Sequence, residues 1–501
     1  MVNTLRLKSV KSIFFFILCM NLPILASEPP APDQKSFVPV WAKNAVFYQI
    51  FPERFANGDP KNDPPNVQPW GGEPKPKNYF GGDLKGIIDH LDYISSLGVN
   101  CLYLNPIFWS NSNHKYHAKD FLKIDPNFGD DRIFKRLVDE CHARKIRIIL
   151  DGVFNHTGVD FFAFDDIKKN GKKSRYVKWY NIYSFPVGPP NKPNYECWWN
   201  YGDLPKLMTH NPEVRDYLYK VTEKWMKMGI DGWRLDVPNE IPHTFWIEWR
   251  KLVKRLNPEA YIVGEIWDDA SPWLKGDQFD AVMNYRFRHA CLDFFVKKTT
   301  SAYQFDTALA KARKDYPNEV NYVLQNLLGS HDTERFLTLC DNDKEQMKLV
   351  WLFQMTYLGA PMVYYGDEVG MRGGKDPGCR GTMVWNPAQQ DQDLLATMKQ
   401  LIALRNSHEV FRNGLYESFL ADEKPKLYGF IRTSPDQKQR AVVLLNNSSE
   451  AQIVDLRSRS WFNGMTWTQA IPAVSSARLT GFDGPVSIPT KSGFVIIGEK
   501  K

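Results

Sequence analysis

Residues 229–240 read GIDGWRLDVPNE and predict a helix end, a short buried strand and an exposed turn, in that order. Gly229 follows a helical pattern, as a residue that ends a helix commonly does. The run 232–235 is short enough for a buried strand, and the carboxylates of Asp236 and Glu240 follow it. In an α/β barrel the chemistry lies at the carboxyl ends of the strands. This stretch therefore predicts a barrel strand that delivers acidic side chains to a site.

A second strand of similar design follows one helix later. Residues 260–265 read AYIVGE, so this strand also ends in a carboxylate, that of Glu265. Adjacent parallel strands end at the same edge of a barrel, and we expect Asp236 and Glu265 to be neighbours. Two paired carboxylates are the machinery of glycoside hydrolysis.

Eight strand segments separated by helical patterns can be read along the central part of the chain. They are residues 46–50, 99–104, 146–150, 232–235, 260–265, 281–283, 322–328 and 361–365. The sixth is weak. Such an alternation predicts an α/β fold, a (β/α)₈ TIM barrel over residues 41–405.

Two further domains are predicted from changes in this pattern. Residues 155–207 are irregular and aromatic, and are too long for an ordinary connection. They predict a small domain inserted after the third barrel strand. Residues 406–501 contain short strands between turn residues, at 426–431, 441–445 and 493–497, and predict a C-terminal antiparallel β-sandwich.

The first 26 residues have the form of a secretory signal peptide. Residues 1–11 carry three basic residues and no acid, and residues 12–26 are apolar but short. We expect cleavage after Ala26, a Pro-rich linker over residues 27–40, and an exported protein that is periplasmic or secreted. An uncleaved anchor and a lipoprotein are the alternatives. No other stretch is apolar for long enough to cross a membrane.

Composition and motifs exclude several classes of function. The net charge of +7 comes without basic runs, so the chain has no nucleic-acid footprint. No C-x-x-C pair is present, which argues against a cysteine zinc site, and the pairing of any disulfide stays open. The H-E-x-x-H and G-x-S-x-G motifs are missing, and residues 370–375 are too short for a P-loop.

Seven charged or histidine residues fall at or just after predicted strand ends. Each alone has a structural interpretation, because an Asp after a strand caps helices, a lone His packs in cores, and an Arg beside an Asp forms ion pairs. The whole set favours a site, because buried charges need partners. Its members are Asp151, His156, Arg234, Asp236, Glu265, His331 and Asp332.

Four motifs in this set resemble the four signature regions of the α-amylase family, glycoside hydrolase family 13. They are DGVFNH at 151–156, GWRLD at 232–236, GEIW at 264–267 and SHD at 330–332, in the family's order. The similarity runs from about residue 46 to residue 385. LPKL at 204–207, Asn239-Glu240 and DTER at 332–335 are similar to the neopullulanase, cyclomaltodextrinase and maltogenic amylase subgroup.

The resemblance implies roles for the three carboxylates. Asp236 corresponds to the nucleophile that forms a covalent glycosyl-enzyme, and Glu265 to the general acid that later activates water. Asp332 corresponds to the residue that binds sugar hydroxyls and stabilises the oxocarbenium-like transition state. A retaining enzyme of this kind holds its two carboxyl groups about 5–5.5 Å apart. We expect the nearby acids to keep Glu265 protonated to higher pH.

The same resemblance implies substrate-binding roles for five more residues. Arg234 would orient Asp236 and keep it ionised, because a nearby cation lowers the pKa of a carboxyl group. His156 and His331 would bond hydroxyls of the sugar at the cleavage point, Asp151 would anchor the site, and Tyr116 would stack on that sugar. The subgroup has Asp where His117 stands here, which leaves the role of His117 open.

A second cluster of polar residues lies near the N-terminus. Its carboxylate and amide oxygens suit calcium, although an Asx-rich turn explains the same composition. The stretch resembles the calcium loop of neopullulanase-like enzymes, which implies a structural Ca²⁺. The candidate ligands are Asn57, Asp59, Asn62, Asp63, Gly81 and Asp83.

Two observations bear on the substrate. The paired Trp198 and Trp199 favour either outer sugar sites or the core of the inserted domain. The subgroup usually has an N-terminal β-domain that builds a dimer, whereas only the signal and the linker precede the first strand here. Dimerisation and cyclodextrin preference are therefore not implied, and the oligomeric state stays open.

We predict a retaining hydrolase that cleaves α-1,4-glucosidic bonds in maltooligosaccharides, starch, cyclodextrins or pullulan. An α-glucan transglycosylase of the same fold is the alternative, because the same intermediate serves both reactions. A non-catalytic sugar-binding or transporter-partner protein is a remote alternative, since Asp236, Glu265 and Asp332 are all present.

Overall fold

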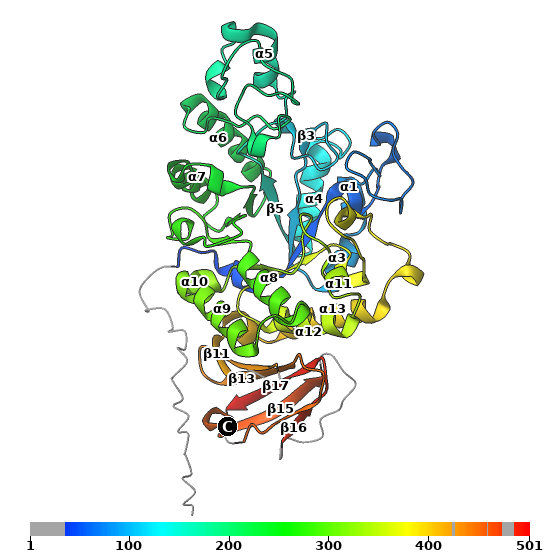
Figure 1. Ribbon diagram of the computed structural model, residues 1–501, viewed down its shortest axis with the longest axis vertical. Helices are drawn as coiled ribbons and strands as arrows, with labels where there is room; N and C mark the ends of the chain where they lie inside the picture. Colours follow the sequence, from blue (N-terminus) through cyan, green and yellow to red (C-terminus); the bar gives the residue numbers. More distant parts are fainter. Residues whose placement is uncertain (1–35, 423–425, 458, 473–484, 501) are drawn as a thin grey trace, which may run out of the picture.

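The computed structural model describes residues 36–422, 426–457, 459–472 and 485–500, so the predicted signal peptide lies outside the described residues. Figure 1 shows three parts along the long axis of the molecule. The barrel lies in the middle, the inserted segment with α5 (Phe162–Asn170) at one end, and the C-terminal sheet at the other.

Eight parallel strands form the barrel in the order β8-β7-β6-β5-β2-β1-β10-β9. A backbone bridge between Met283 and Gln325 joins the two outermost strands and closes the ring. The predicted TIM barrel is thus confirmed, its weak sixth strand included. The strands are β1 (Phe47–Ile50), β2 (Cys101–Leu104), β5 (Arg147–Gly152), β6 (Gly232–Leu235), β7 (Tyr261–Gly264), β8 (Ala281–Val282), β9 (Gln325–Leu327) and β10 (Ala360–Tyr364).

The seventh strand is shorter than expected. Residues 322–328 were the predicted strand, but only Gln325–Leu327 is extended. The preceding Asn318–Asn321 forms α10, and Tyr322 ends that helix with its amide bonded to the carbonyl of Glu319. The predicted start of this strand is therefore wrong.

Helices cover the outside of the barrel. In α4 the carboxylate of Asp130 accepts hydrogen bonds from the amides of Arg132 and Ile133, which fixes the start of the helix. Its buried face has helical spacing and consists of Phe134, Leu137, Val138 and Cys141. The main outer helices are α2 (Leu84–Asp89), α3 (Leu91–Leu97), α4 (Asp131–Ala143), α6 (Pro212–Lys227), α7 (His243–Leu256), α8 (Tyr285–Cys291), α9 (Ala302–Asp315), α12 (Lys344–Thr356) and α13 (Gln392–Ser407).

The connection after β2 contains a β-hairpin that the sequence did not predict. Its strands are β3 (Phe108–Ser110) and β4 (Ala118–Ile124). The loop between them is held by the buried Lys115, whose Nζ lies 2.9 Å from Asp125 Oδ2. This hairpin carries Tyr116 to the mouth of the barrel.

The inserted segment after β5 contains α5 and several single turns. Four isolated bridges hold it together, and one of them joins His156 to Lys206 at its two ends. The segment therefore begins and ends beside the barrel mouth, which agrees with the inserted domain in the predicted fold.

The C-terminal region is the predicted antiparallel β-sandwich. One sheet has the order β11-β12-β13-β17-β15 and the other pairs β14 with β16. Apolar side chains of both sheets, such as Val442 and Ile488, share one core. The strands are β11 (Leu415–Ala421), β12 (Leu427–Thr433), β13 (Gln439–Asn446), β14 (Gln452–Val454), β15 (Met465–Pro472), β16 (Val486–Ile488) and β17 (Ser492–Lys500).

Buried polar contacts attach this sandwich to the barrel. Asp306 on α9 accepts hydrogen bonds from the hydroxyls of Tyr428 at 2.7 Å and Ser418 at 2.8 Å. Arg432 on β12 is fully buried and donates to the carbonyl of Thr356 at 2.8 Å. The two parts therefore share one polar interface.

The six cysteines among the described residues are all free thiols. Over the same residues, no helix is both long and apolar enough to cross a membrane.

Candidate active site

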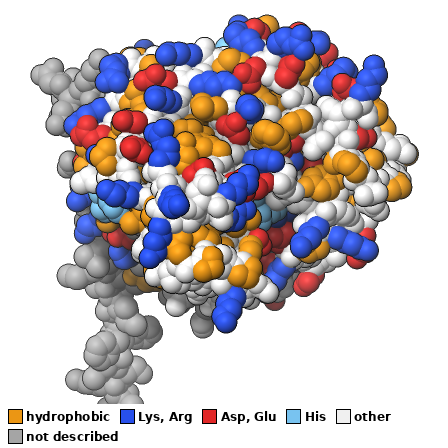
Figure 2. All heavy atoms as spheres, turned by 90° about the horizontal axis from the view of Figure 1, so that it is seen from above, with side chains coloured by type: hydrophobic (Ala, Val, Ile, Leu, Met, Phe, Trp, Pro, Cys, Tyr) orange, Lys and Arg blue, Asp and Glu red, His pale blue; other side chains and the backbone are white. Residues whose placement is uncertain are grey.

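Strand register brings the predicted acidic residues together. The β5–β6 pairing places Asp151 opposite Arg234, and the β6–β7 pairing places Leu235 opposite Gly264. Asp236 and Glu265, one residue further on, therefore end neighbouring strands at the same level. Figure 2 views the molecule from this end and shows a hollow in which acidic and histidine side chains are visible.

Arg234 lies at the centre of the acidic residues and is fully buried. Its Nη1 lies 2.8 Å from Asp151 Oδ1 and 3.0 Å from Asp236 Oδ1, and its Nη2 lies 2.9 Å from Glu265 Oε2. One guanidinium thus binds three carboxylates. Loss of such a buried cation would leave uncompensated charges, at a cost of roughly 3–5 kcal/mol.

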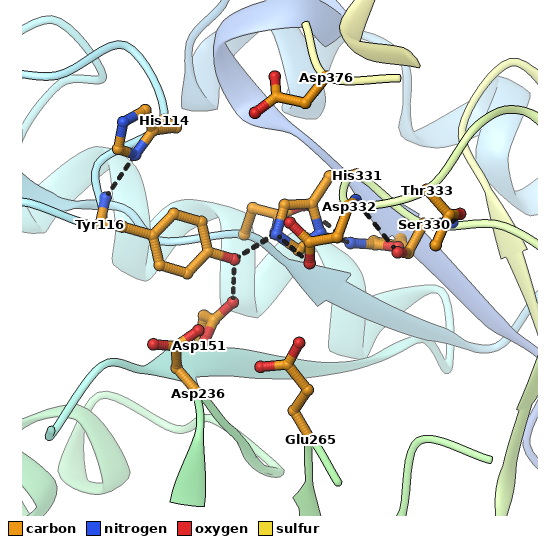
Figure 3. Close-up of polar contacts among 12 residues, drawn as sticks. His114, Tyr116, Asp151, Asp236, Glu265, Ser330, His331, Asp332, Thr333 and Asp376 are labelled. Atoms are coloured by element: carbon orange, nitrogen blue, oxygen red, sulfur yellow. Dashed lines mark hydrogen bonds and ion pairs between the residues drawn. The ribbon is translucent and has the colours of Figure 1, made fainter. Parts of the chain in front are cut away.

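Asp151 is held from its other side by two tyrosines. Its Oδ2 accepts hydrogen bonds from the hydroxyls of Tyr103 at 2.8 Å and Tyr116 at 2.9 Å. Figure 3 shows Tyr116 pointing from the hairpin toward both Asp151 and His331. Arg234, Tyr103 and Tyr116 therefore fix the position of Asp151.

The protonation pattern of His331 follows from its neighbours. Gln49 Nε2, an N–H donor, lies 2.8 Å from His331 Nδ1, so that nitrogen accepts. The neutral ring must then carry its proton on Nε2, which lies 2.6 Å from the Tyr116 hydroxyl. Burial lowers the pKa of His331, with the charges of Arg380 and Arg234 adding to the effect, which keeps the ring neutral.

Asp332 is the most accessible of the three proposed catalytic carboxylates, with 29% of its side chain exposed. Its Oδ2 lies 3.1 Å from His331 Nε2, and its Oδ1 lies 3.3 Å from Arg380 Nη2. Arg380 also donates from Nε to the carbonyl of His331 at 2.9 Å. Arg380 therefore lies where it can orient Asp332.

His156 is buried beside the inserted segment. Its Nδ1 lies 3.3 Å from the side-chain nitrogen Nδ2 of Asn155, and its Nε2 has no hydrogen-bond partner among the described residues. Burial, together with the smaller effects of the charges of His117 and Lys206, lowers the pKa of His156 to about 3. The neutral ring stacks on Trp198 with centroids 5.7 Å apart.

Burial raises the pKa of both proposed catalytic carboxyls. For Asp236 burial is the largest cause, Arg234 lowers the pKa, and the charges of Glu265, Asp151 and Asp332 raise it. For Glu265 burial is again the largest cause, Arg234 opposes it, and Asp332 adds to it. The expected effect of Arg234 on Asp236 is present but smaller than that of burial. The pair therefore titrates jointly and retains a proton above the ordinary carboxyl range.

Val237, next to Asp236, has a strained backbone. Its φ of 35° and ψ of 50° are left-handed, which a β-branched residue rarely adopts. In this conformation its amide donates to Glu265 Oε2 at 3.2 Å. The strain thus serves to fix Glu265 relative to Asp236.

The six predicted calcium ligands lie together in one loop region. Asn57 donates to Asp63 Oδ1 at 2.8 Å, and Asn62 donates to Asp83 Oδ2 at 3.1 Å. The amide of Asp59 donates to Asp83, and a Cβ on Gly81 would come within 2.3 Å of Asp63 Oδ1.

The donor set of this loop fits a hard cation. Asn57 Oδ1 and Asn62 Oδ1 are buried without a hydrogen-bond partner among the described residues. Burial raises the pKa of Asp63 and of Asp83, so both carboxylates lack full compensation. Over the described residues, no three or more His, Cys, Asp or Glu side chains group as a metal site, and the amides supply the remaining donors here.

Sequence reasoning missed three polar residues that organise the pocket. Gln49 on β1 and Tyr103 on β2 face the barrel interior, and Asn105 follows β2. Asn105 donates to the Tyr116 hydroxyl at 2.9 Å. Strand-end position is a signal that could have found Asn105, whereas Gln49 and Tyr103 lie within apolar strands. His117, whose role was open, lies with its ring edge-on to His114.

Comparison with known proteins agrees with this geometry. The profile described as the catalytic domain of alpha amylase matches residues 49–400. The chain is 52% identical over 436 residues to neopullulanase 2 of Thermoactinomyces vulgaris, covering 86% of this chain and 74% of that protein. It is 50% identical over 425 residues to a cyclomaltodextrinase of Thermoanaerobacter pseudethanolicus, covering 84% and 73%.

A solved structure gives the same result in three dimensions. The cyclic alpha-maltosyl-(1→6)-maltose hydrolase from Arthrobacter globiformis, in complex with cyclic alpha-maltosyl-(1→6)-maltose, superposes with a TM-score of 0.85 at 41% identity. The match covers 92% of this chain and 99% of that chain.

Proposed function

The chain belongs to the α-amylase family of glycoside hydrolases, and we propose that it cleaves α-1,4-glucosidic bonds with retention of configuration. Its substrates would be maltooligosaccharides, starch, cyclodextrins or pullulan, as the names of the neopullulanase and cyclomaltodextrinase relatives suggest. The observation that carries the proposal is the pairing of Asp236 and Glu265 on the two arms of the buried Arg234.

In the first step Glu265 protonates the glycosidic oxygen while Asp236 attacks the anomeric carbon. The C–O bond to the leaving sugar breaks, and a covalent glycosyl-Asp236 ester forms. This step needs one proton on the pair, and burial together with the neighbouring carboxylates supports its retention. In the second step the ionised Glu265 takes a proton from water, which displaces Asp236.

We infer that three other residues hold the sugar, namely His156, His331 and Asp332. His156 Nε2 is left without a protein partner, and the Nε2–H of His331 faces the pocket beside Tyr116 and Asp332. Both rings are neutral, so they act as hydrogen-bond donors to hydroxyls rather than as cations. Asp332 remains partly accessible and would accept hydroxyl hydrogen bonds as charge develops in the transition state.

Product analysis tests the proposed function. Purified mature protein would be incubated separately with γ-cyclodextrin, pullulan, soluble starch and maltotriose, and the products separated by chromatography. Cyclodextrin or pullulan cleaved faster than starch is expected for a neopullulanase-like enzyme. Products longer than maltotriose from maltotriose would assign glycosyl transfer instead. No turnover of any substrate would contradict the proposal.

We also propose that the 57–83 loop region binds a structural Ca²⁺. In the present geometry the amide nitrogens of Asn57 and Asn62 face the carboxylates of Asp63 and Asp83. A half-turn of either amide would place its oxygen beside the carboxylate, an arrangement that a bound cation stabilises.

Removal of calcium is expected to lower the melting temperature without changing the order of substrate preference, because the loop lies outside the catalytic residues. Calorimetry before and after treatment with EGTA, and after added Ca²⁺, measures this. Asp63→Asn should abolish the response to EGTA. An unchanged melting temperature, with no metal found by elemental analysis, would contradict the site.

Finally, we propose that the protein is exported. The support is the sequence of residues 1–26, with its basic start and short apolar run. N-terminal sequencing of the protein recovered from a fractionated bacterial host should begin at Ser27. Recovery in the cytoplasmic fraction with Met1 retained would contradict export.

A further inference from the structure

Two of the most exposed aromatic side chains in the described chain lie next to the active site. Trp199 is 72% exposed and Tyr201 is 60% exposed, and both belong to the inserted segment. Trp198 lies between them and the pocket. Exposed apolar side chains gathered in this way mark binding surfaces more often than packing.

The three rings continue the wall of the active site outward. His156, beside the pocket, stacks on Trp198. Trp198 in turn lies parallel to Trp199, with centroids 5.2 Å apart and planes inclined by 17°, and to Tyr201, with centroids 5.7 Å apart and planes inclined by 25°. A continuous aromatic series therefore leads from the pocket to the solvent.

Trp199 is held in place at a cost to its backbone. Its φ of 46° and ψ of 35° are left-handed, and Asn200 after it has a φ of 64°. Aromatic residues rarely adopt this conformation, and it persists only where the surroundings enforce it. The indole Nε1 donates to Glu240 Oε1 at 3.0 Å, and Glu240 Oε2 lies 3.2 Å from Lys206 Nζ. A solvent-exposed ring with only a packing role would not need such an anchor.

We propose that Trp199 and Tyr201 form an outer sugar platform, which binds a glucose unit of an α-glucan beyond those held in the catalytic pocket. The proposal rests on the proposed function, because it takes the substrate to be an α-glucan. Pyranose rings present apolar C–H faces that stack on aromatic rings, and the anchored indole offers such a surface without losing side-chain freedom on binding. Only a chain long enough to leave the pocket reaches the platform.

Chain-length kinetics tests the platform. We expect Trp199→Ala to lower kcat/KM for maltoheptaose by roughly threefold to tenfold, the range of one aromatic contact. The value for maltotriose should change less than twofold. Trp199→Gly, which suits the left-handed backbone, should behave alike, and Trp199→Phe should restore most of the loss because it keeps a ring. Tyr303→Ala is the matched control, since Tyr303 is 58% exposed on α9, far from the inserted segment.

Equal losses on both substrates, or no loss on either, would overturn the platform. A second measurement keeps the test independent of turnover. Calorimetric titration of maltoheptaose into Asp236→Asn, with and without Trp199→Gly, should show weaker binding in the double variant by a similar factor. If the wild type hydrolyses neither sugar, the proposed function fails, and this titration still decides whether the platform binds α-glucan.

Discussion

Asp236→Asn is expected to lower kcat on maltooligosaccharides by roughly four orders of magnitude or more, because no covalent intermediate can form. The amide keeps the size of the carboxyl group and leaves Arg234 with Asp151 and Glu265 as partners. Burial raises the pKa of Asp236, so a neutral side chain is tolerated there. We therefore expect the melting temperature to stay the same or to rise.

Single-turnover kinetics and calorimetry on the same preparation measure both effects. Asp139→Asn on α4 is the matched control, because that carboxylate is 59% exposed and its ion-pair partner among the described residues is Lys135. It should change neither activity nor stability. Turnover by Asp236→Asn within a factor of about a hundred of the wild type would assign the nucleophile elsewhere.

Glu265→Gln is expected to lose about 10²–10⁴-fold in kcat on maltooligosaccharides, the usual contribution of a general acid. The loss should be far smaller for the first step with α-maltosyl fluoride, because fluoride leaves without a proton. Water would then react slowly without its base, so the glycosyl-Asp236 ester should accumulate and be visible by mass spectrometry. Azide, which needs no base, should release it. Equal losses on both substrates would refute the assignment.

The assignment of Glu265 also predicts the direction in which activity changes with pH. Glu265 must be protonated, so activity falls as the pH rises through the pKa of Glu265. Asp236 must be ionised, so activity increases as the pH rises through the pKa of Asp236. Burial raises the pKa of both groups, and both limbs of kcat/KM should lie above the ordinary carboxyl values of about 3.9 and 4.3. When Glu265→Gln acts on α-maltosyl fluoride, the rate of the first step should no longer fall at high pH.

The barrel could be predicted from sequence because most of its strands are short, mainly apolar runs between helical patterns. The part of the fold that does not follow this rule is the hairpin β3–β4. Its second strand, AKDFLKI, mixes charged and apolar residues, and the hairpin depends on the buried contact of Lys115 with Asp125. The apolar residues at helical spacing over 84–97 belong to two helices, α2 and α3, because His90 leaves the helical conformation and its ring bonds the carbonyl of Gly86. Such contacts have no local pattern.

The site could be predicted in part, because several of its residues lie at the ends of predictable strands. Strand ends indicated Arg234, Asp236 and Glu265 directly, and the family resemblance supplied their roles. The role of Gln49 could not be predicted, because its contact with His331 joins residues that are 282 positions apart in the sequence. The direction in which the pKa of Asp236 is shifted could not be predicted either. It depends on how deeply the carboxyl group is buried, which no sequence pattern measures.

The closure of the barrel has a consequence for how activity is acquired during refolding. β8 and β9 meet through the single bridge between Met283 and Gln325. Asp236 and Glu265 lie on one side of that seam in the strand order, and His331 and Asp332 follow β9 on the other. A partly folded chain can therefore hold most of the helices and strands and still lack a complete pocket. During refolding, the recovery of enzymatic turnover, more than that of the circular dichroism of the helices, therefore shows when β8 and β9 pair and close the barrel.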